Sequence, residues 1–92
     1  MALLNDDEIA ERLRDSEWER EGDEIVREWK VEDFAAAMRF VNRVADAAEE
    51  ANHHPDILVH GWNKVRLSLT NHSAGGLTPA DFTMAERFDG LV

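Results

Sequence analysis

The sequence contains no cysteine, which excludes disulfide frameworks, thiolate metal sites and cysteine nucleophiles and leaves nothing that marks an oxidising compartment. It also lacks long apolar runs, since none approaches the roughly 20 residues that a membrane-spanning helix needs. The opening segment, MALLNDDEIAERL, has no basic leader of the kind that begins a secretory signal. We therefore expect a soluble, cytoplasmic protein that does not contact membranes.

Basic residues are scarce as well. The sequence has 10 lysines and arginines and 20 aspartates and glutamates, so its formal charge is -10 at pH 7. Binding to a phosphate backbone needs clustered lysine and arginine, so nucleic acid is not an expected partner. Only Lys30 and Lys64 are lysines, and such an acidic surface suggests a salt-loving, halophilic host, where ions screen the self-repulsion. An ordinary solvated surface explains the composition equally well.

The chain has 92 residues, which is the size of one domain with a single core, so we expect one domain over residues 1–92. A domain this small buries only about 60 to 65% of the surface that its unfolded chain exposes. Association with further copies of the chain is therefore expected.

Two local patterns occupy the first third of the chain. Asn5 and the acidic residues after it resemble a capping box, and apolar residues then recur at helical spacing, so residues 5–16 are predicted to form a short helix. Residues 24–31 alternate between apolar and charged side chains, which predicts a strand. A short partner strand is expected near Trp18, across the turn at residues 22–23.

A long helix is predicted from about residue 33 to residue 52, where the apolar spacing becomes helical. Pro55 pushes the residue before it out of the helical region, so the helix should stop there and leave His53 and His54 at its exit. The expected apolar stripe of this helix consists of Phe34, Ala37, Met38, Val41, Val44, Ala45 and Ala48.

The last third of the chain reads as two strands and a helix. Residues 57–62 and 64–70 are predicted to form two strands joined by a tight turn at Asn63, and apolar and polar side chains alternate in the second. The segment Thr78-Pro79-Ala80-Asp81 has the residues of a helix start, and this helix should run to about residue 89. The order of elements predicts an α+β fold, a four-stranded antiparallel sheet with three helices packed on one face.

Four histidines lie between positions 53 and 72, and histidine is the side chain whose unperturbed pKa lies near neutrality. A cluster of them can both give and accept protons. If the two predicted strands form a hairpin, the chain returns from His53 and His54 towards His72, so both ends can share one site. Taken alone, however, His53 and His54 are somewhat better explained as a hydrophilic helix end, where the helix dipole favours imidazolium.

Neighbouring residues have simple explanations. His60 lies within a predicted strand, where a surface or cross-strand role fits best, and Asp81 is most economically a capping carboxylate. Trp18, Trp29 and Trp62 are more typical of a core or an interface than of a ligand platform. A zinc site is the competing explanation for the histidine cluster, because zinc binds histidine and carboxylate ligands. Neither an H-x3-H nor an H-E-x-x-H pattern is present, however, so no metal site is expected.

The histidines belong to a longer pattern of a charged residue, a His-His-Pro triplet, an aromatic residue, a further histidine and an aspartate: Glu49, His53-His54-Pro55, Trp62, His72 and Asp81. This pattern resembles the signature of the pterin-4a-carbinolamine dehydratases. The segments WKVEDFAAAMRFVNRVA and WNKVRLSLTNHSAGGLTPAD also fit that family, whereas the first 25 residues match it only loosely.

The resemblance implies a hydro-lyase that eliminates water across C4a and N5 of a 4a-hydroxytetrahydropterin. The product is the quinonoid dihydropterin of tetrahydrobiopterin-type cofactor recycling. Histidine acid-base catalysis, typically worth about 10²- to 10⁴-fold, would carry the reaction without a metal or other cofactor. His53 and His72 would transfer protons, and His54 would chiefly hold the pterin and could also serve as base. The residues implied to bind substrate are Glu49, Pro55, Asn71, Ser73 and Asp81, the last by orienting His72 or capping its helix.

The same resemblance leaves a second function open. Members of the family form dimers and tetramers, so a homodimer or a homotetramer is expected, and animal relatives also act as dimerisation cofactors for a homeodomain transcription factor. The alternative is therefore a non-catalytic interaction module with the same fold. The intact His53, His54 and His72 favour the enzyme, because a scaffold has no need of three histidines that converge on one cleft. Whether the pterin serves a hydroxylase, a folate-like pool or molybdopterin metabolism stays open.

Overall fold

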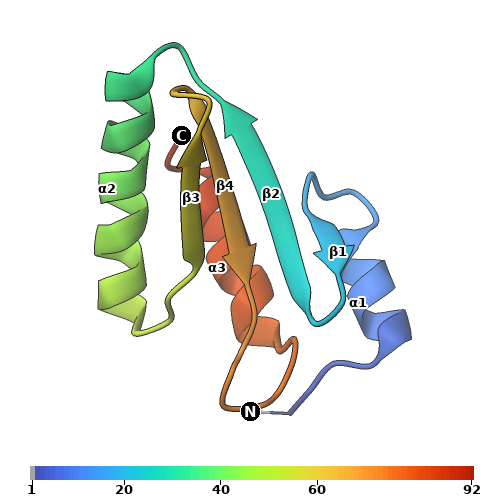
Figure 1. The fold of residues 1–92 in the computed structure, drawn as a ribbon. Coiled ribbons are helices and arrows are strands. Elements are labelled where there is room, and N and C mark those ends of the chain that lie inside the picture. The colour runs from blue at the N-terminus through green and yellow to red at the C-terminus, as the bar shows by residue number, and fades with distance from the viewer. Residues whose placement is uncertain (1) are drawn as a thin grey trace.

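The computed structural model describes residues 2–92, which form three helices and a four-stranded antiparallel sheet (Figure 1). All three helices pack against one face of the sheet, so the predicted α+β architecture is confirmed. Within these residues no helix has the length and apolarity that crossing a membrane requires. In chain order the elements are α1 (Asp6–Leu13), β1 (Glu19–Glu21), β2 (Glu24–Lys30), α2 (Phe34–Ala51), β3 (Asp56–His60), β4 (Lys64–Leu69) and α3 (Pro79–Asp89).

The sheet has the strand order β1-β2-β4-β3, and every neighbouring pair is antiparallel. Successive side chains of a strand point to opposite faces. Val65, Leu67 and Leu69 of β4 therefore share one face and are fully buried, and Ile25 and Trp29 of β2 join them in the core. The alternation predicted for both strands is confirmed, and the core lies between this face and the helices.

Helix α2 buries only part of the predicted stripe: Ala37, Val44 and Ala48 are buried as predicted. Phe34 and Ala45, both expected in the stripe, are exposed, whereas Phe40 is buried and lies edge-on to Trp29 with 4.9 Å between the ring centroids. Apolar residues occupy more than one side of this helix, so periodicity alone did not fix which side faces the sheet. The buried residues of α2 are Ala37, Phe40, Val44, Ala47 and Ala48.

Helix α1 begins at the predicted capping box. The Asn5 side chain accepts the Glu8 N–H, and the Glu8 carboxylate accepts the Asn5 N–H, which satisfies two donors of the helix start. The helix ends at Leu13, earlier than predicted, because the chain turns there to place Trp18 in the core. Ser16 fixes this turn, since its hydroxyl accepts the Trp18 N–H.

The turn between β3 and β4 is longer than predicted. Trp62 lies in the turn and not in the strand, with a φ of 60°, and follows Gly61, whose φ is 55°. Asn63 is buried; its carbonyl accepts the Val31 N–H and its side-chain amide donates to the Val31 carbonyl. Trp62 is 61% exposed, so this tryptophan, unlike the other two, is no part of the core.

The face of the sheet away from the helices carries paired charges. His60 on β3 donates to Glu28 on β2 across the intervening β4, which confirms the cross-strand role predicted for this histidine. Arg66 on β4 donates to Glu21 on β1. This hydrogen bond and the charge of Glu21 raise the pKa of the Arg66 guanidinium above its ordinary value.

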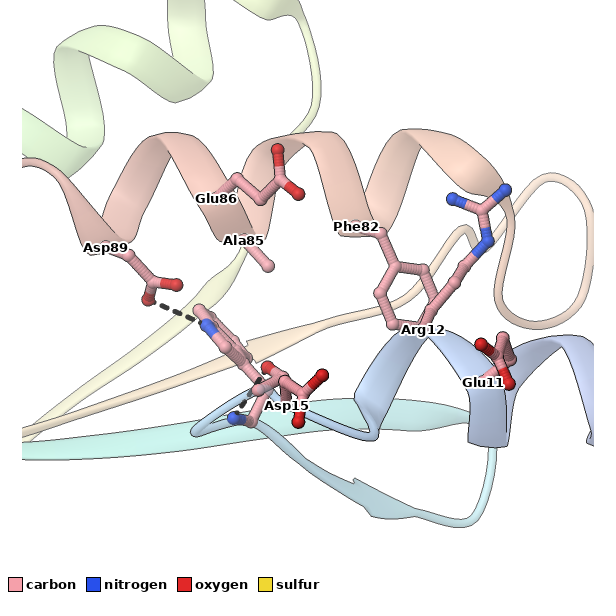
Figure 2. A pocket seen from close by; sticks show the side chains of 9 residues that line it. Glu11, Arg12, Asp15, Phe82, Ala85, Glu86 and Asp89 are labelled. Atoms are coloured by element: carbon pink, nitrogen blue, oxygen red, sulfur yellow. Dashed lines mark hydrogen bonds between the residues drawn. The ribbon is translucent and has the colours of Figure 1, made fainter.

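One carboxylate ties the end of α3 to the sheet and to the segment after α1 (Figure 2). Asp89 Oδ1 accepts the Trp18 indole N–H at 2.8 Å, as the dashed line from Asp89 in Figure 2 marks. The same oxygen accepts an N–H of the Arg27 guanidinium, also at 2.8 Å. Trp18 is buried and the Arg27 side chain is only 23% exposed. Water therefore replaces Asp89 poorly as the acceptor for these two donors.

We expect Asp89→Ala to lower the free energy of unfolding by about 1–2 kcal/mol, because a buried indole and a half-buried guanidinium lose their acceptor. Urea denaturation followed by tryptophan fluorescence measures the change. The control is Glu86→Ala, which removes an exposed carboxylate from the same helix and should change stability by less than about 0.5 kcal/mol. Equal losses in the two variants would contradict the assigned role of Asp89.

Candidate active site

Two connections bring the predicted histidines to the same end of the sheet (Figure 1). Residues 52–55 join α2 to β3, and residues 70–78 join β4 to α3. A hollow of about 320 Å³ lies between them, which we call the histidine hollow. The three histidines predicted to share a site therefore do line one hollow. Its lining residues are Asn52, His53, His54, Thr70, Asn71, His72 and Ser73.

Asn52 sets the exit of α2. Its backbone is left-handed, with φ 50° and ψ 43°, a conformation that asparagine tolerates better than most residues. Its N–H donates to the carbonyls of Ala48 and Glu49, and the His53 N–H donates to the Ala48 carbonyl at 3.1 Å. These bonds satisfy carbonyls that the last turn leaves free. The helix therefore ends at Ala51 with Asn52 as its cap, so His53 and His54 lie at its exit as predicted.

A buried carboxylate holds His53. The Nε2–H of His53 donates to Oδ1 of Asp81 at 2.7 Å, and Asp81 is fully buried. The second oxygen, Oδ2, accepts the Thr78 N–H at 2.9 Å and the Thr78 hydroxyl at 3.3 Å. Because Nε2 is committed to the carboxylate, Nδ1 is the ring nitrogen of His53 that remains for proton exchange with a ligand.

The structure corrects the predicted partner of Asp81. We expected this carboxylate to orient His72 or to cap its helix. The capping role is confirmed, but the histidine that Asp81 contacts is His53. The physical reason is the packing of α3 against α2, which places the first turn of α3 beside the exit of α2 and leaves His72 exposed in the preceding loop.

His54 belongs to an exposed pair. Its Nε2–H donates to Oε2 of Glu49 at 2.6 Å, and the two side chains are 54% and 77% exposed. Solvent screens such a pair, so it orients the ring more weakly than a buried carboxylate does. Glu49 and Pro55, both expected to bind substrate, are absent from the lining of the hollow. Glu49 contacts His54 instead, and Pro55 leads into β3.

Asn71 shapes the loop that carries His72. Its carbonyl accepts the Gly75 N–H at 2.9 Å, and its side-chain oxygen accepts the Ala74 N–H at 3.0 Å. Asn71, expected to bind substrate, therefore closes the loop as well as lining the hollow. His72 and Ser73 are exposed, and within residues 2–92 the His72 ring makes no hydrogen bond. Both ring nitrogens of His72 remain for a ligand.

Sequence reasoning missed two lining residues, Asn52 and Thr70. Asn52 had a usable signal, since asparagine is a common left-handed helix terminator and it directly precedes the histidines. Another hollow, of about 390 Å³, lies between α1 and α3 and contains no histidine (Figure 2). Across residues 2–92, no group of three or more histidines and carboxylates is arranged to hold a metal ion.

We expect neutral His53 to carry its proton on Nε2, because Nε2 faces a carboxylate that only accepts. Long-range ¹H–¹⁵N correlation spectra of histidine-labelled protein report the tautomer. In Asp81→Asn the side-chain amide can donate to Nε2, so the proton should move to Nδ1. His60, which is held by Glu28, should keep its wild-type pattern in this variant. A wild-type His53 with its proton on Nδ1 would contradict the assignment.

The site thus has the side chains that a proton-transfer site would need: three histidines share one hollow, and a buried carboxylate holds one of them. A family model described as pterin 4 alpha carbinolamine dehydratase matches residues 2–91. A protein of Roseiflexus castenholzii named "Putative pterin-4-alpha-carbinolamine dehydratase" is 50% identical, over 99% of this chain and 98% of its own. A protein of the same name from Natronomonas pharaonis is 46% identical, over 97% and 95%. The chain belongs to the pterin-4a-carbinolamine dehydratase family.

Solved structures agree with this assignment. The crystal structure of a "transcriptional coactivator/pterin dehydratase" from Brucella melitensis is 32% identical in sequence and covers 97% of both chains with a TM-score of 0.90. A pterin dehydratase-like RuBisCO assembly factor of the alpha-carboxysome, 24% identical, shares the fold with a TM-score of 0.70 over 84% of this chain and 90% of that one. The resemblance stated from the sequence is confirmed.

Proposed function

We propose that this chain dehydrates a 4a-hydroxytetrahydropterin to the quinonoid dihydropterin. The observation that carries the proposal is the His53–Asp81 pair, which presents one oriented imidazole to a hollow that His54 and His72 also line. Membership of the family supports a pterin as the substrate. A histidine whose tautomer is fixed by a buried carboxylate suits general acid-base catalysis.

The reaction needs two proton transfers and nothing else. The C4a–O bond breaks as the hydroxyl takes a proton from one imidazolium and leaves as water. The N5–H bond breaks as a second imidazole takes that proton, and its electron pair forms the C4a–N5 double bond. No electrons enter or leave, so the reaction needs no redox cofactor, and two histidines supply both proton transfers without a metal. We assign the two transfers to His53 and His72.

The remaining predicted residues have supporting roles in this proposal. His54 holds the pterin and can serve as a base, and Glu49 orients His54 through their hydrogen bond. Asn71 and Ser73 line the hollow and contact the ring. Pro55 stiffens the connection that follows His54. These roles rest on position in the hollow and on the family motif.

We expect His53→Ala and His72→Ala each to slow dehydration about 10²- to 10⁴-fold, because each removes a proton-transfer group. The rate is followed by ultraviolet absorbance after enzymatic generation of the 4a-hydroxytetrahydropterin, at low and at high salt. His60→Ala is the matched control, since this histidine lies outside the hollow and pairs with Glu28. His72 is exposed, so His72→Ala should melt like the wild type. Equal melting together with an equal rate would refute its role.

The same measurement separates the enzyme from an interaction module. The Brucella melitensis relative is titled both a coactivator and a pterin dehydratase, so a protein-binding role is a real second candidate. A folded wild type that does not accelerate dehydration, and a partner protein whose binding survives replacement of His53, His54 and His72, would favour the module.

Further expectations from the sequence accompany the proposal: one domain over residues 1–92, a homodimer or homotetramer, and a cytoplasmic, halophilic setting. The halophilic setting is inferred from the formal charge of -10. We expect the melting temperature to rise with salt, because counterions screen the repulsion among carboxylates. Melting curves between low and molar salt measure the effect, and a flat response would remove the halophilic interpretation.

A further inference from the structure

A second hollow shares a wall with the histidine hollow. It has a volume of about 380 Å³, and we call it the acidic hollow because Asp23 and Glu24 contribute its carboxylates. Thr70, Asn71 and His72 line both hollows, so these three residues form the common wall. A ligand that contacts His72 from the histidine hollow can extend into the acidic hollow.

The acidic hollow is a built feature of the fold. The Thr70 hydroxyl donates to the Asp23 carbonyl at 2.6 Å, which fastens the β1–β2 turn to the end of β4. On the opposite side, Asn71 and Gly76 pair as an isolated bridge. Gly75, with a φ of 81°, and Gly76 contribute no side chain to the hollow, which keeps this side open.

The two carboxylates remain available for a ligand. Within residues 2–92, neither the Asp23 nor the Glu24 carboxylate lies in an ion pair or accepts a hydrogen bond, since the Thr70 hydroxyl binds the backbone carbonyl of Asp23. The guanidinium of Arg66 binds Glu21, and the charge of Glu24 is the smallest of the causes that raise the Arg66 pKa. The hollow thus offers hydrogen-bond acceptors and negative charge, and it contains no arginine or lysine to bind an anion.

The position of the hollow relates to the chemistry of the ring. In pterins the substituent that varies is attached to C6, which is bonded to N5, one of the two reacting atoms. We take His72 as the base that serves N5, so the C6 substituent of a bound ring starts beside His72. His72 stands in the wall between the two hollows, so a substituent that passes it enters the acidic hollow.

We propose that Asp23 and Glu24 select the C6 substituent of the substrate. Hydroxyl groups of a neutral polyhydroxyalkyl chain donate to the carboxylates, whereas a phosphate ester on the same chain is repelled by them. The protein then prefers 4a-hydroxytetrahydropterins with an uncharged, hydroxylated substituent over phosphorylated ones. This inference rests on the proposed dehydration.

Three substrates test it: the carbinolamines of a trihydroxypropyl or dihydroxypropyl pterin, of its phosphate ester and of 6-methylpterin, which lacks hydroxyl groups. We expect wild-type kcat/KM for the phosphate ester to be about tenfold or more below that for the neutral polyol. In Asp23→Asn/Glu24→Gln the preference for the neutral polyol over the phosphate ester should fall at least about threefold, with the change in KM and not in kcat.

The matched control is Asp15→Asn/Glu86→Gln, which removes the same two charges from the hollow between α1 and α3 (Figure 2). It should keep the wild-type preference, because its carboxylates lie outside both site hollows. An unchanged preference in Asp23→Asn/Glu24→Gln, or the same loss in the control, would overturn the role of the acidic hollow and leave the dehydratase standing. A folded wild type that dehydrates none of the three substrates would overturn both.

Discussion

The site depends on one buried carboxylate. Asp81 is fully buried, and a buried charge is costly unless hydrogen bonds satisfy both of its oxygens. One oxygen is satisfied by Thr78 at the start of α3, and the other by His53 at the exit of α2. The same group therefore caps a helix, joins two helices and fixes a ring. Stability and the geometry of the proposed proton transfer are coupled through it.

Local patterns predicted most of this arrangement. The capping box at Asn5, the cap at Thr78 and the alternation in β2 and β4 each depend on residues within a few positions, and each is present in the structure. The convergence of His53, His54 and His72 followed from a hairpin that returns the chain to its starting end. Topology alone brings them to one hollow.

Long-range packing decided what the sequence could not. Asp81 contacts His53 and not His72 because of how α3 crosses α2, and no local pattern encodes that crossing. The buried side of α2 was also predicted only in part, since Phe34 and Phe40 are equally apolar and only contact with the sheet distinguishes them. Trp62 lies in the turn and not in the predicted strand, because Gly61 and Trp62 adopt positive φ angles that the sequence pattern does not reveal.

The three histidines are held to unequal degrees, and this difference suits a two-proton reaction. His53 is fixed by a buried carboxylate, His54 by an exposed one, and His72 by no side chain within residues 2–92. A fixed ring offers one defined nitrogen to the ligand, whereas an unrestrained ring can adjust to the atom that it serves. Dehydration moves one proton to oxygen and another from nitrogen, at two different positions of the ring. One preset and one adaptable histidine can meet both positions without rearrangement of the fold.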